Sequence, residues 1–173
     1  MNGATPTVLL TGATGYIGSR LSDLLLTRSG ITLRVFVRNR QKLRDSIRER
    51  VEIAEGDTFA PRALDQALQG VDTAYYLIHS MRAGKDYEER DRQSAANFRD
   101  ACIRAGVKRL VYLGGLGVKA TASRHLLSRI ETGEILSGKP EELQTGWFRA
   151  GVIIGSGSAS FEIIRHLVQK LLI

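Results

Sequence analysis

Three glycines, spaced three residues apart, join an apolar run to a segment of helical periodicity near the start of the chain. The apolar residues 8–10 predict a short buried strand, and the recurring leucine and isoleucine side chains of residues 16–27 predict a helix. Gly12 allows a tight turn, Gly15 lets a ligand approach the backbone, and Gly18 lets the helix pack closely on a sheet. Free N–H groups at the start of that helix suit a diphosphate, and a turn without ligand is the alternative. We expect contacts from the whole turn: Gly12, Ala13, Thr14, Gly15, Tyr16, Ile17 and Gly18.

The same alternation of strand and helix patterns continues along the chain. Strands are predicted at 7–11, 33–37, 51–54, 73–78, 109–113 and 147–154, and helices at 16–27, 41–50, 61–69, 87–105, 123–136 and 160–173. Short connections between them are typical of parallel β-α-β units with helices on both faces. We therefore expect one domain over residues 1–173, a Rossmann-like three-layer α/β/α sandwich with a strand order near 3-2-1-4-5-6. The apolar last residues carry no helix stop signal, so we expect a truncated C-terminal substrate part.

Composition excludes several classes of site and partner. Cys102 is the single cysteine, and three histidines lie far apart, so we expect neither a disulfide nor a metal site. No apolar run approaches the roughly 20 residues of a membrane span, and residues 1–6 do not resemble a signal peptide. The net charge of +7 comes with only 6% aromatic residues and no nucleic-acid-binding motif. We expect a cytoplasmic protein without membrane or nucleic-acid partners.

The basic charge is concentrated around the end of the second predicted strand. NAD-binding folds usually place an acidic residue about 20 residues beyond the glycine turn, where it binds the ribose 2′-hydroxyl. Here residues 37–40 read Val-Arg-Asn-Arg, without an acid. Arg38 is suited to a ribose 2′-phosphate, which predicts NADP(H) in preference to NAD(H). NAD(H), with Arg38 on a solvated basic surface, stays an alternative.

Further motifs carry a resemblance to a known family. They are Gly56-Asp57-Thr58, the segment from Tyr75 to Met81, the segment from Val111 to Gly117, and the run Gly-Ser-Gly-Ser-Ala-Ser-Phe-Glu that begins at Gly155. With them the chain resembles the atypical short-chain dehydrogenase/reductase superfamily, within it the NAD(P)H-binding NmrA-like and epimerase/dehydratase-like proteins of the YbjT-like group. The resemblance implies cofactor contacts from Asp57 and Thr58 to the adenine, from Leu77, Ile78 and His79 to its ribose, and from Gly114 and Gly115 near the nicotinamide. The alternatives are an Asx turn for Asp57 and a packing role for His79.

The catalytic pattern of that superfamily is incomplete in this chain. Its usual Tyr-x-x-x-Lys motif is absent, because no tyrosine follows Tyr112. The family alignment puts His125 at the tyrosine position, Arg129 at the lysine position and Gly115 at the serine position. Arginine cannot release a proton at neutral pH, whereas histidine titrates near 6.5, so His125 is the candidate acid or base. The alternative is that His125 packs on its own helix.

Two functions follow from these observations. The first is an NADP(H)-dependent oxidoreductase or epimerase/dehydratase-like enzyme that acts on an unknown small molecule. The second is a non-catalytic NADP(H)-binding sensor or regulator of the NmrA-like kind, which the loss of the tyrosine–lysine pair favours. An apolar face on the last helix would also favour homo-oligomers.

Overall fold

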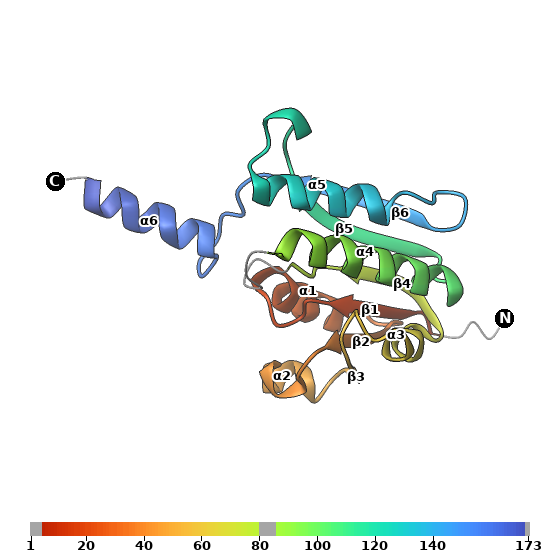
Figure 1. Cartoon of the computed structure of the whole chain (residues 1–173). Coiled ribbons are helices and arrows are strands. Elements are labelled where there is room, and N and C mark those ends of the chain that lie inside the picture. Colours follow the sequence, from red (N-terminus) through yellow and green to blue (C-terminus); the bar gives the residue numbers. More distant parts are fainter. Residues whose placement is uncertain (1–4, 80–85, 172–173) are drawn as a thin grey trace.

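A six-stranded parallel sheet between two layers of helices forms the part of the chain described by the computed structural model, residues 5–79 and 86–171 (Figure 1). The strand order is β3-β2-β1-β4-β5-β6, and every neighbouring pair is parallel. This confirms the predicted Rossmann-like sandwich and its strand order. The strands are β1 (Thr7–Thr11), β2 (Thr32–Val37), β3 (Glu52–Glu55), β4 (Val71–Tyr76), β5 (Arg109–Gly115) and β6 (Gln144–Ala150).

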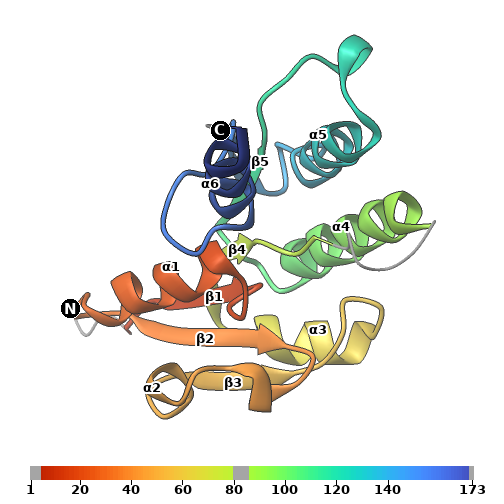
Figure 2. The same ribbon diagram turned by 90° about the vertical axis from the view of Figure 1, so that its left-hand side faces the viewer.

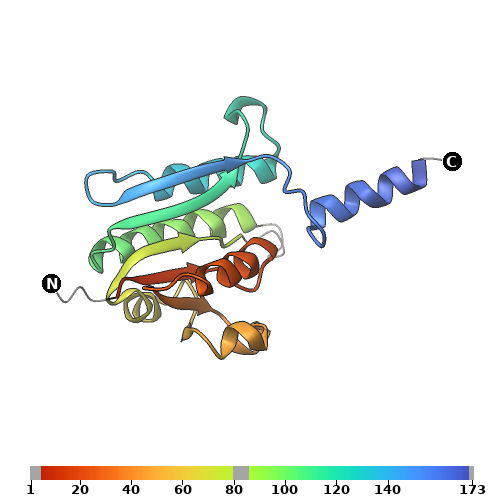
Figure 3. The same ribbon diagram turned by 180° about the vertical axis from the view of Figure 1, so that it is seen from behind.

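Helices cover the two faces of the sheet unequally. On one side lie α1 (Tyr16–Leu26) and α2 (Asp45–Arg48), and on the other α3 (Pro61–Leu68), α4 (Tyr87–Arg104) and α5 (Arg124–Leu136), as Figure 2 shows. Two 3₁₀ turns, η1 (Arg40–Lys42) and η2 (Lys119–Thr121), lie in the connections. The last helix, α6 (Ala159–Leu171), extends away from the sheet (Figure 3). None of the helices in these described ranges has the length and apolar character needed to span a bilayer.

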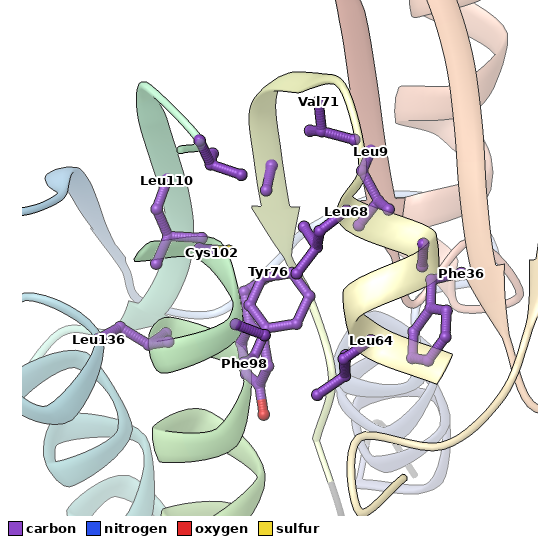
Figure 4. Packing of buried hydrophobic residues seen from close by; sticks show 14 of the residues in the cluster. Leu9, Phe36, Leu64, Leu68, Val71, Tyr76, Phe98, Cys102, Leu110 and Leu136 are labelled. Atoms are coloured by element: carbon purple, nitrogen blue, oxygen red, sulfur yellow. The ribbon is translucent and has the colours of Figure 1, made fainter. Parts of the chain in front are cut away.

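Alternate strand residues supply two hydrophobic cores. Leu9 packs under α3 and α4 with Tyr76 and Phe98, all of them at most 1% exposed (Figure 4). Its neighbours on the strand, Val8 and Leu10, point to the opposite face and pack against α1. Because both faces are covered, the middle residues 8–10 of β1 are all apolar, as the sequence predicts for a central parallel strand. Fully burying one such side chain stabilises the fold by about 1.5–3 kcal/mol.

Cys102 lies in the larger core, on α4. Its side chain is fully buried and forms no disulfide. Burial raises the pKa of its thiol, because a thiolate would lose its hydration there. The cysteine is therefore an unreactive packing residue in the folded chain.

The single helix predicted over residues 41–50 is wrong. The chain forms η1, returns to an extended backbone at Leu43 (ψ 143°) and Arg44 (ψ 142°), and then forms the four-residue α2. The side chain of Asn39 accepts a hydrogen bond from the Gln41 amide and starts η1. Leu43 and Ile47, which a helix over 41–50 would also place on one face, are both buried in this broken arrangement.

Two strands are displaced from their predicted ranges. Strand β4 begins at Val71 and ends at Tyr76, so Leu77 and Ile78 lie beyond it. Strand β6 ends at Ala150, opposite Gly115, which is the last residue of its neighbour β5. The apolar residues that had suggested a later strand, Val152 and Ile154, are 58% and 74% exposed.

Candidate functional site

The glycine turn lies at the carboxyl end of β1, and two of its glycines are required by close packing. Gly12 has a φ of +70°, and a Cβ atom there would lie 2.6 Å from the Leu77 carbonyl oxygen. Gly18 is buried, and a Cβ there would collide with the carbonyl oxygen of Gly12. The Gly15 amide donates to the same carbonyl oxygen at 2.9 Å and closes the turn. These contacts fix where α1 begins.

The outer side of the turn is open to a ligand. Thr14 and Gly15 are exposed, and a Cβ on Gly15 would meet only the Gly12 carbonyl oxygen, at 3.3 Å. No side chain caps the start of α1, and its first turn holds no acidic residue. The first N–H groups and the positive end of the helix dipole are therefore available to an anion. Ala13 is buried and only its backbone can take part.

Thr11 connects the turn to the neighbouring strand, a role that sequence reasoning missed. Its hydroxyl donates to the Tyr75 carbonyl at 3.0 Å and accepts from the Leu77 amide at 2.9 Å. The side chain is fully buried. It holds the residues after β4 against the glycine turn. The turn and residues 77–79, both predicted from the sequence to contact the cofactor, therefore lie side by side. A hydroxyl at the end of an otherwise apolar strand was the available signal.

Arg38 stands at the carboxyl end of β2 with its guanidinium free. It is exposed, and within the described part of the chain no hydrogen bond or ion pair holds it. Two other arginines of this region have structural partners: Arg34 pairs with Glu52 at 2.8 Å and Arg44 with Asp23 at 2.7 Å. Position and freedom together make Arg38 available to an external anion.

The predicted adenine contacts lie beyond β3, where local hydrogen bonds organise them. One carboxylate oxygen of Asp57 accepts from the Phe59 amide at 3.1 Å, which is the Asx turn named as its alternative. The Thr58 hydroxyl is buried and bonds Ser94 at 2.8 Å, and Ser94 bonds the Tyr76 hydroxyl at 2.7 Å. The side chain of Thr58 thus packs into the core, and its contact with the adenine stays a prediction.

Tyr16 links the turn to the loop after β6. The Arg20 guanidinium lies 3.7 Å from the centre of its ring and donates to the Ser156 carbonyl at 2.9 Å. The backbone of Gly155 packs against the Tyr16 hydroxyl. Ile17, the next residue, is half-buried. Two residues of the motif that carried the family resemblance, Ser80 and Met81, lie outside the described residues.

His79 and His125 meet at the carboxyl edge, although they are 46 residues apart. Nε2 of His79 lies 3.2 Å from Nδ1 of His125, and the ring centroids are 4.6 Å apart. On its other side, Nδ1 of His79 lies 3.2 Å from the Oδ2 atom of Asp91, on α4. That carboxylate is buried and also accepts from the Ser128 hydroxyl at 3.1 Å. Sequence reasoning missed Asp91 and Ser128.

The pKa of His125 lies below its ordinary value. Partial burial is the main cause, because the imidazolium would lose hydration, and the positive charges that His79 and Arg129 can carry add to it. Asp91 acts in the opposite direction. His125 is therefore neutral near pH 7, and its unprotonated ring nitrogen can accept a proton.

The end of β5 lacks the hydroxyl that the family places there. Leu126 occupies the space into which a Cβ of Gly115 would extend, and Trp147 does so at Gly114. Arg129 donates to the Leu113 carbonyl at 2.6 Å, which makes it a fixed structural cation. Tyr112 does not replace the missing tyrosine, because burial raises its pKa to about 12.

The fold and the open glycine turn define a Rossmann-type dinucleotide-binding protein. The chain belongs to the NAD(P)H-binding family, whose model matches residues 12–143. This match confirms the resemblance to NAD(P)-binding proteins of the epimerase- and reductase-like kind.

Curated relatives share part of the sequence. The chain is 34% identical over 115 residues to sterol demethylase protein B of Methylococcus capsulatus, which covers 64% of this chain and 35% of that protein. It is 29% identical over 117 residues to a UDP-glucose 4-epimerase of Azospirillum brasilense, with 63% and 33% covered. The chain therefore matches about a third of the length of these relatives.

Solved structures share the fold. Pen from Bacillus thuringiensis superposes with a TM-score of 0.79 at 17% identity, over 98% of this chain and 57% of that one. The triphenylmethane reductase of Citrobacter sp., complexed with NADP(H), gives a TM-score of 0.71 at 21% identity, over 95% and 55%. MoeE5 in complex with UDP-glucose and NAD gives 0.75 at 21%, over 94% and 60%.

Proposed function

We propose that this protein binds NADP(H) in preference to NAD(H) and uses it in hydride chemistry on a small molecule. The observation that carries the cofactor preference is Arg38, an exposed guanidinium without partners in the described part of the chain, at the end of β2 where NAD-binding folds usually have an acid. A ribose 2′-phosphate would give Arg38 a charge-assisted hydrogen bond. Such a bond contributes about 1.5–3 kcal/mol, or about ten- to a hundredfold in affinity.

The residues of the turn fit the rest of the coenzyme. The uncapped start of α1 offers N–H groups to the diphosphate, and the exposed backbone of Gly15 leaves space for it. The backbone of Leu77 and Ile78, Asp57, and the glycines that end β5 lie along the same carboxyl edge, where ligands of parallel sheets bind. Proteins of the same fold have been solved with NADP(H) and with NAD.

Dissociation constants for NADPH and NADH test the preference. We expect the native protein to bind NADPH more tightly, and Arg38→Ala to lose about ten- to a hundredfold of NADPH affinity while NADH affinity stays unchanged. Arg28→Ala is the matched control, because Arg28 is also exposed but precedes β2, at the opposite edge of the sheet. Equal affinities of the native protein for the two coenzymes would contradict the proposal.

For the chemical step we assign His125 as the group that exchanges a proton with the substrate. Bound NADPH would supply a hydride to a carbonyl carbon of the substrate. The carbonyl oxygen then gains negative charge and needs a proton. His125 lies on the first turn of α5, beside the end of β5, and is neutral near pH 7. Arg129, held on the Leu113 carbonyl, keeps α5 in position against β5.

The second candidate is a non-catalytic NADP(H)-binding sensor or regulator. Gly115 favours it, because a glycine cannot supply the substrate-holding hydroxyl that the family has at this position. NADPH oxidation with a panel of quinones, aldehydes and sugar nucleotides separates the two functions. Turnover that His125→Ala reduces at least about a hundredfold supports the enzyme, whereas tight NADPH binding without turnover supports the sensor.

A further inference from the structure

Three side chains form a continuous line of hydrogen-bonding groups from the core to the sheet edge. Asp91 is innermost, with its side chain 4% exposed, and His79 follows with 17% exposed. His125 is outermost and half-buried. The three residues come from α4, the segment after β4 and α5, so only the folded sheet brings them together.

The hydrogen bonds of this line restrict where protons can reside. Nδ1 of His79 faces a carboxylate oxygen, which can only accept, so that nitrogen carries a proton. The remaining nitrogens, Nε2 of His79 and Nδ1 of His125, face each other at 3.2 Å, and one proton lies between them. If His79 provides it, His79 is a cation beside Asp91, and His125 keeps its proton on Nε2. If the shared proton belongs to Nδ1 of His125, both rings are neutral and Nε2 of His125 carries no proton.

The surrounding charges favour a single extra proton on the pair. The Asp91 carboxylate stabilises a cation on His79. Arg129 and His79 oppose a second charge on His125, and the nearest other cation on α5, Arg124, is paired with Glu88 at 2.8 Å. Two adjacent imidazoles that share a site titrate as a pair, with well-separated steps.

We propose that Asp91, His79 and His125 are a proton relay, which replaces the missing tyrosine–lysine pair in the proposed hydride chemistry. His125 is the catalytic residue, and its Nε2–H donates to a substrate oxygen of carbonyl type. As that proton leaves, Nδ1 of His125 takes the proton of His79 Nε2, and His79 keeps its Nδ1–H on Asp91.

The electrons and protons balance in this step. A hydride adds to the carbonyl carbon, the C=O π pair moves to oxygen, and the oxygen takes the proton from His125. The pair changes from one positive charge to neutral, and solvent returns one proton before the next turnover. His79 and Asp91 are positioning residues, since they act only through His125.

Histidine NMR tests the relay without any turnover. The chain has three histidines, and His166 on α6 is exposed and remote, so His→Gln variants assign every imidazole signal. In the native protein we expect ¹⁵N shifts that place a proton on Nδ1 of His79, and one proton shared by His79 and His125. Asp91→Asn should lower the pH at which this shared proton is released and leave the His166 signals unchanged.

A second pair of variants covers the case in which Asp91→Asn fails to fold. His79→Gln should convert the titration of His125 to that of a single independent site. Ser128→Ala, which removes a second donor to Asp91, should preserve the coupled titration of the two histidines. Independent titration of His79 and His125 in the native protein would overturn the relay.

The relay rests on the proposed NADP(H) function, and the outcomes separate the two. Absence of NADP⁺ binding by the native protein overturns the proposed function whatever the histidines do. If NADP⁺ binds, it should shift the His125 signals and leave those of His166 in place; no shift at His125 would overturn its role at the site. In the active protein, His79→Gln should lower kcat and flatten its pH profile with little change in KM.

Discussion

A single methyl group at Gly18 would disrupt the most conspicuous motif of the sequence. The hypothetical Cβ collides with the Gly12 carbonyl oxygen and lies 2.9 Å from the Ala13 Cα atom. Both obstacles are backbone atoms of the turn, so neither can rotate away. The turn therefore depends on glycine at this position for steric reasons, independently of any ligand.

Gly18→Ala should accordingly destabilise the fold by about 1–3 kcal/mol, the usual cost of forcing an extra carbon into a packed site. Urea unfolding followed by the fluorescence of Trp147, the single tryptophan, measures the change. Gly151→Ala is the control, because a Cβ at Gly151 meets no atom within 4 Å. Equal stabilities of the two variants would contradict the close contact between Gly18 and the Gly12 carbonyl oxygen.

Single residues also show what part of the site was predictable. The glycine turn and Arg38 follow from local sequence, because neighbouring residues determine a turn and the end of a strand. The line through Asp91, His79 and His125 does not, since its members are 12 and 46 positions apart and meet only through the strand order. Asp91 resembled any other charge on an amphipathic helix until α4 was placed against β4.

At the scale of secondary-structure elements, buried hydroxyls join three neighbours. Ser94 on α4 bonds Tyr76 on β4 and Thr58 in the loop after β3. All three side chains are at most 5% exposed. Removal of the central hydroxyl leaves two polar groups in the core without that partner.

Ser94→Ala should therefore destabilise the protein by about 1–3 kcal/mol. The double variant Tyr76→Phe with Ser94→Ala should cost less than the sum of the single variants, since the two hydroxyls interact directly. Denaturant unfolding supplies all the values, and Ser46→Ala, an exposed serine on α2, is the control. Strict additivity would contradict a direct Tyr76–Ser94 hydrogen bond.

Elements were predicted well where burial and periodicity agree, and poorly where tertiary contacts decide. Strand β1 has its predicted bounds, and α4 ends one residue before its predicted end. The segment over residues 41–50 has helical periodicity, but an extended backbone at Leu43 and Arg44 interrupts it. The end of β6 depends on where β5 stops pairing, which local sequence does not record.

At the scale of the whole molecule, an extensive apolar surface is exposed. On α6, Ile163 is 61%, Leu167 52% and Leu171 79% exposed. Phe148 on the edge strand β6 is 62% exposed. Surfaces of this kind tend to associate in water, as the sequence led us to expect for the last helix.

We expect this chain to self-associate as its concentration rises, with a weight-average mass above that of the monomer in sedimentation experiments. Leu167→Lys should shift the distribution towards monomer, because it places a charge in the apolar face of α6. Gln169→Lys adds the same charge at an exposed polar position of that helix and should leave association unchanged. A native chain that stays monomeric at high concentration would contradict the prediction.

The buried thiol of Cys102 gives the molecule an internal reporter. A reagent can modify this sulfur only after α4 separates from the sheet, so the labelling rate records how often the larger core opens. Coenzyme bound at the glycine turn, on the other side of β1, would slow the labelling only by stabilising the closed form. At a coenzyme concentration of a hundred times its Kd, that stabilisation is about 2.7 kcal/mol. The labelling rate of a single sulfur atom thereby reports how coenzyme binding at the sheet edge changes the opening of the larger core.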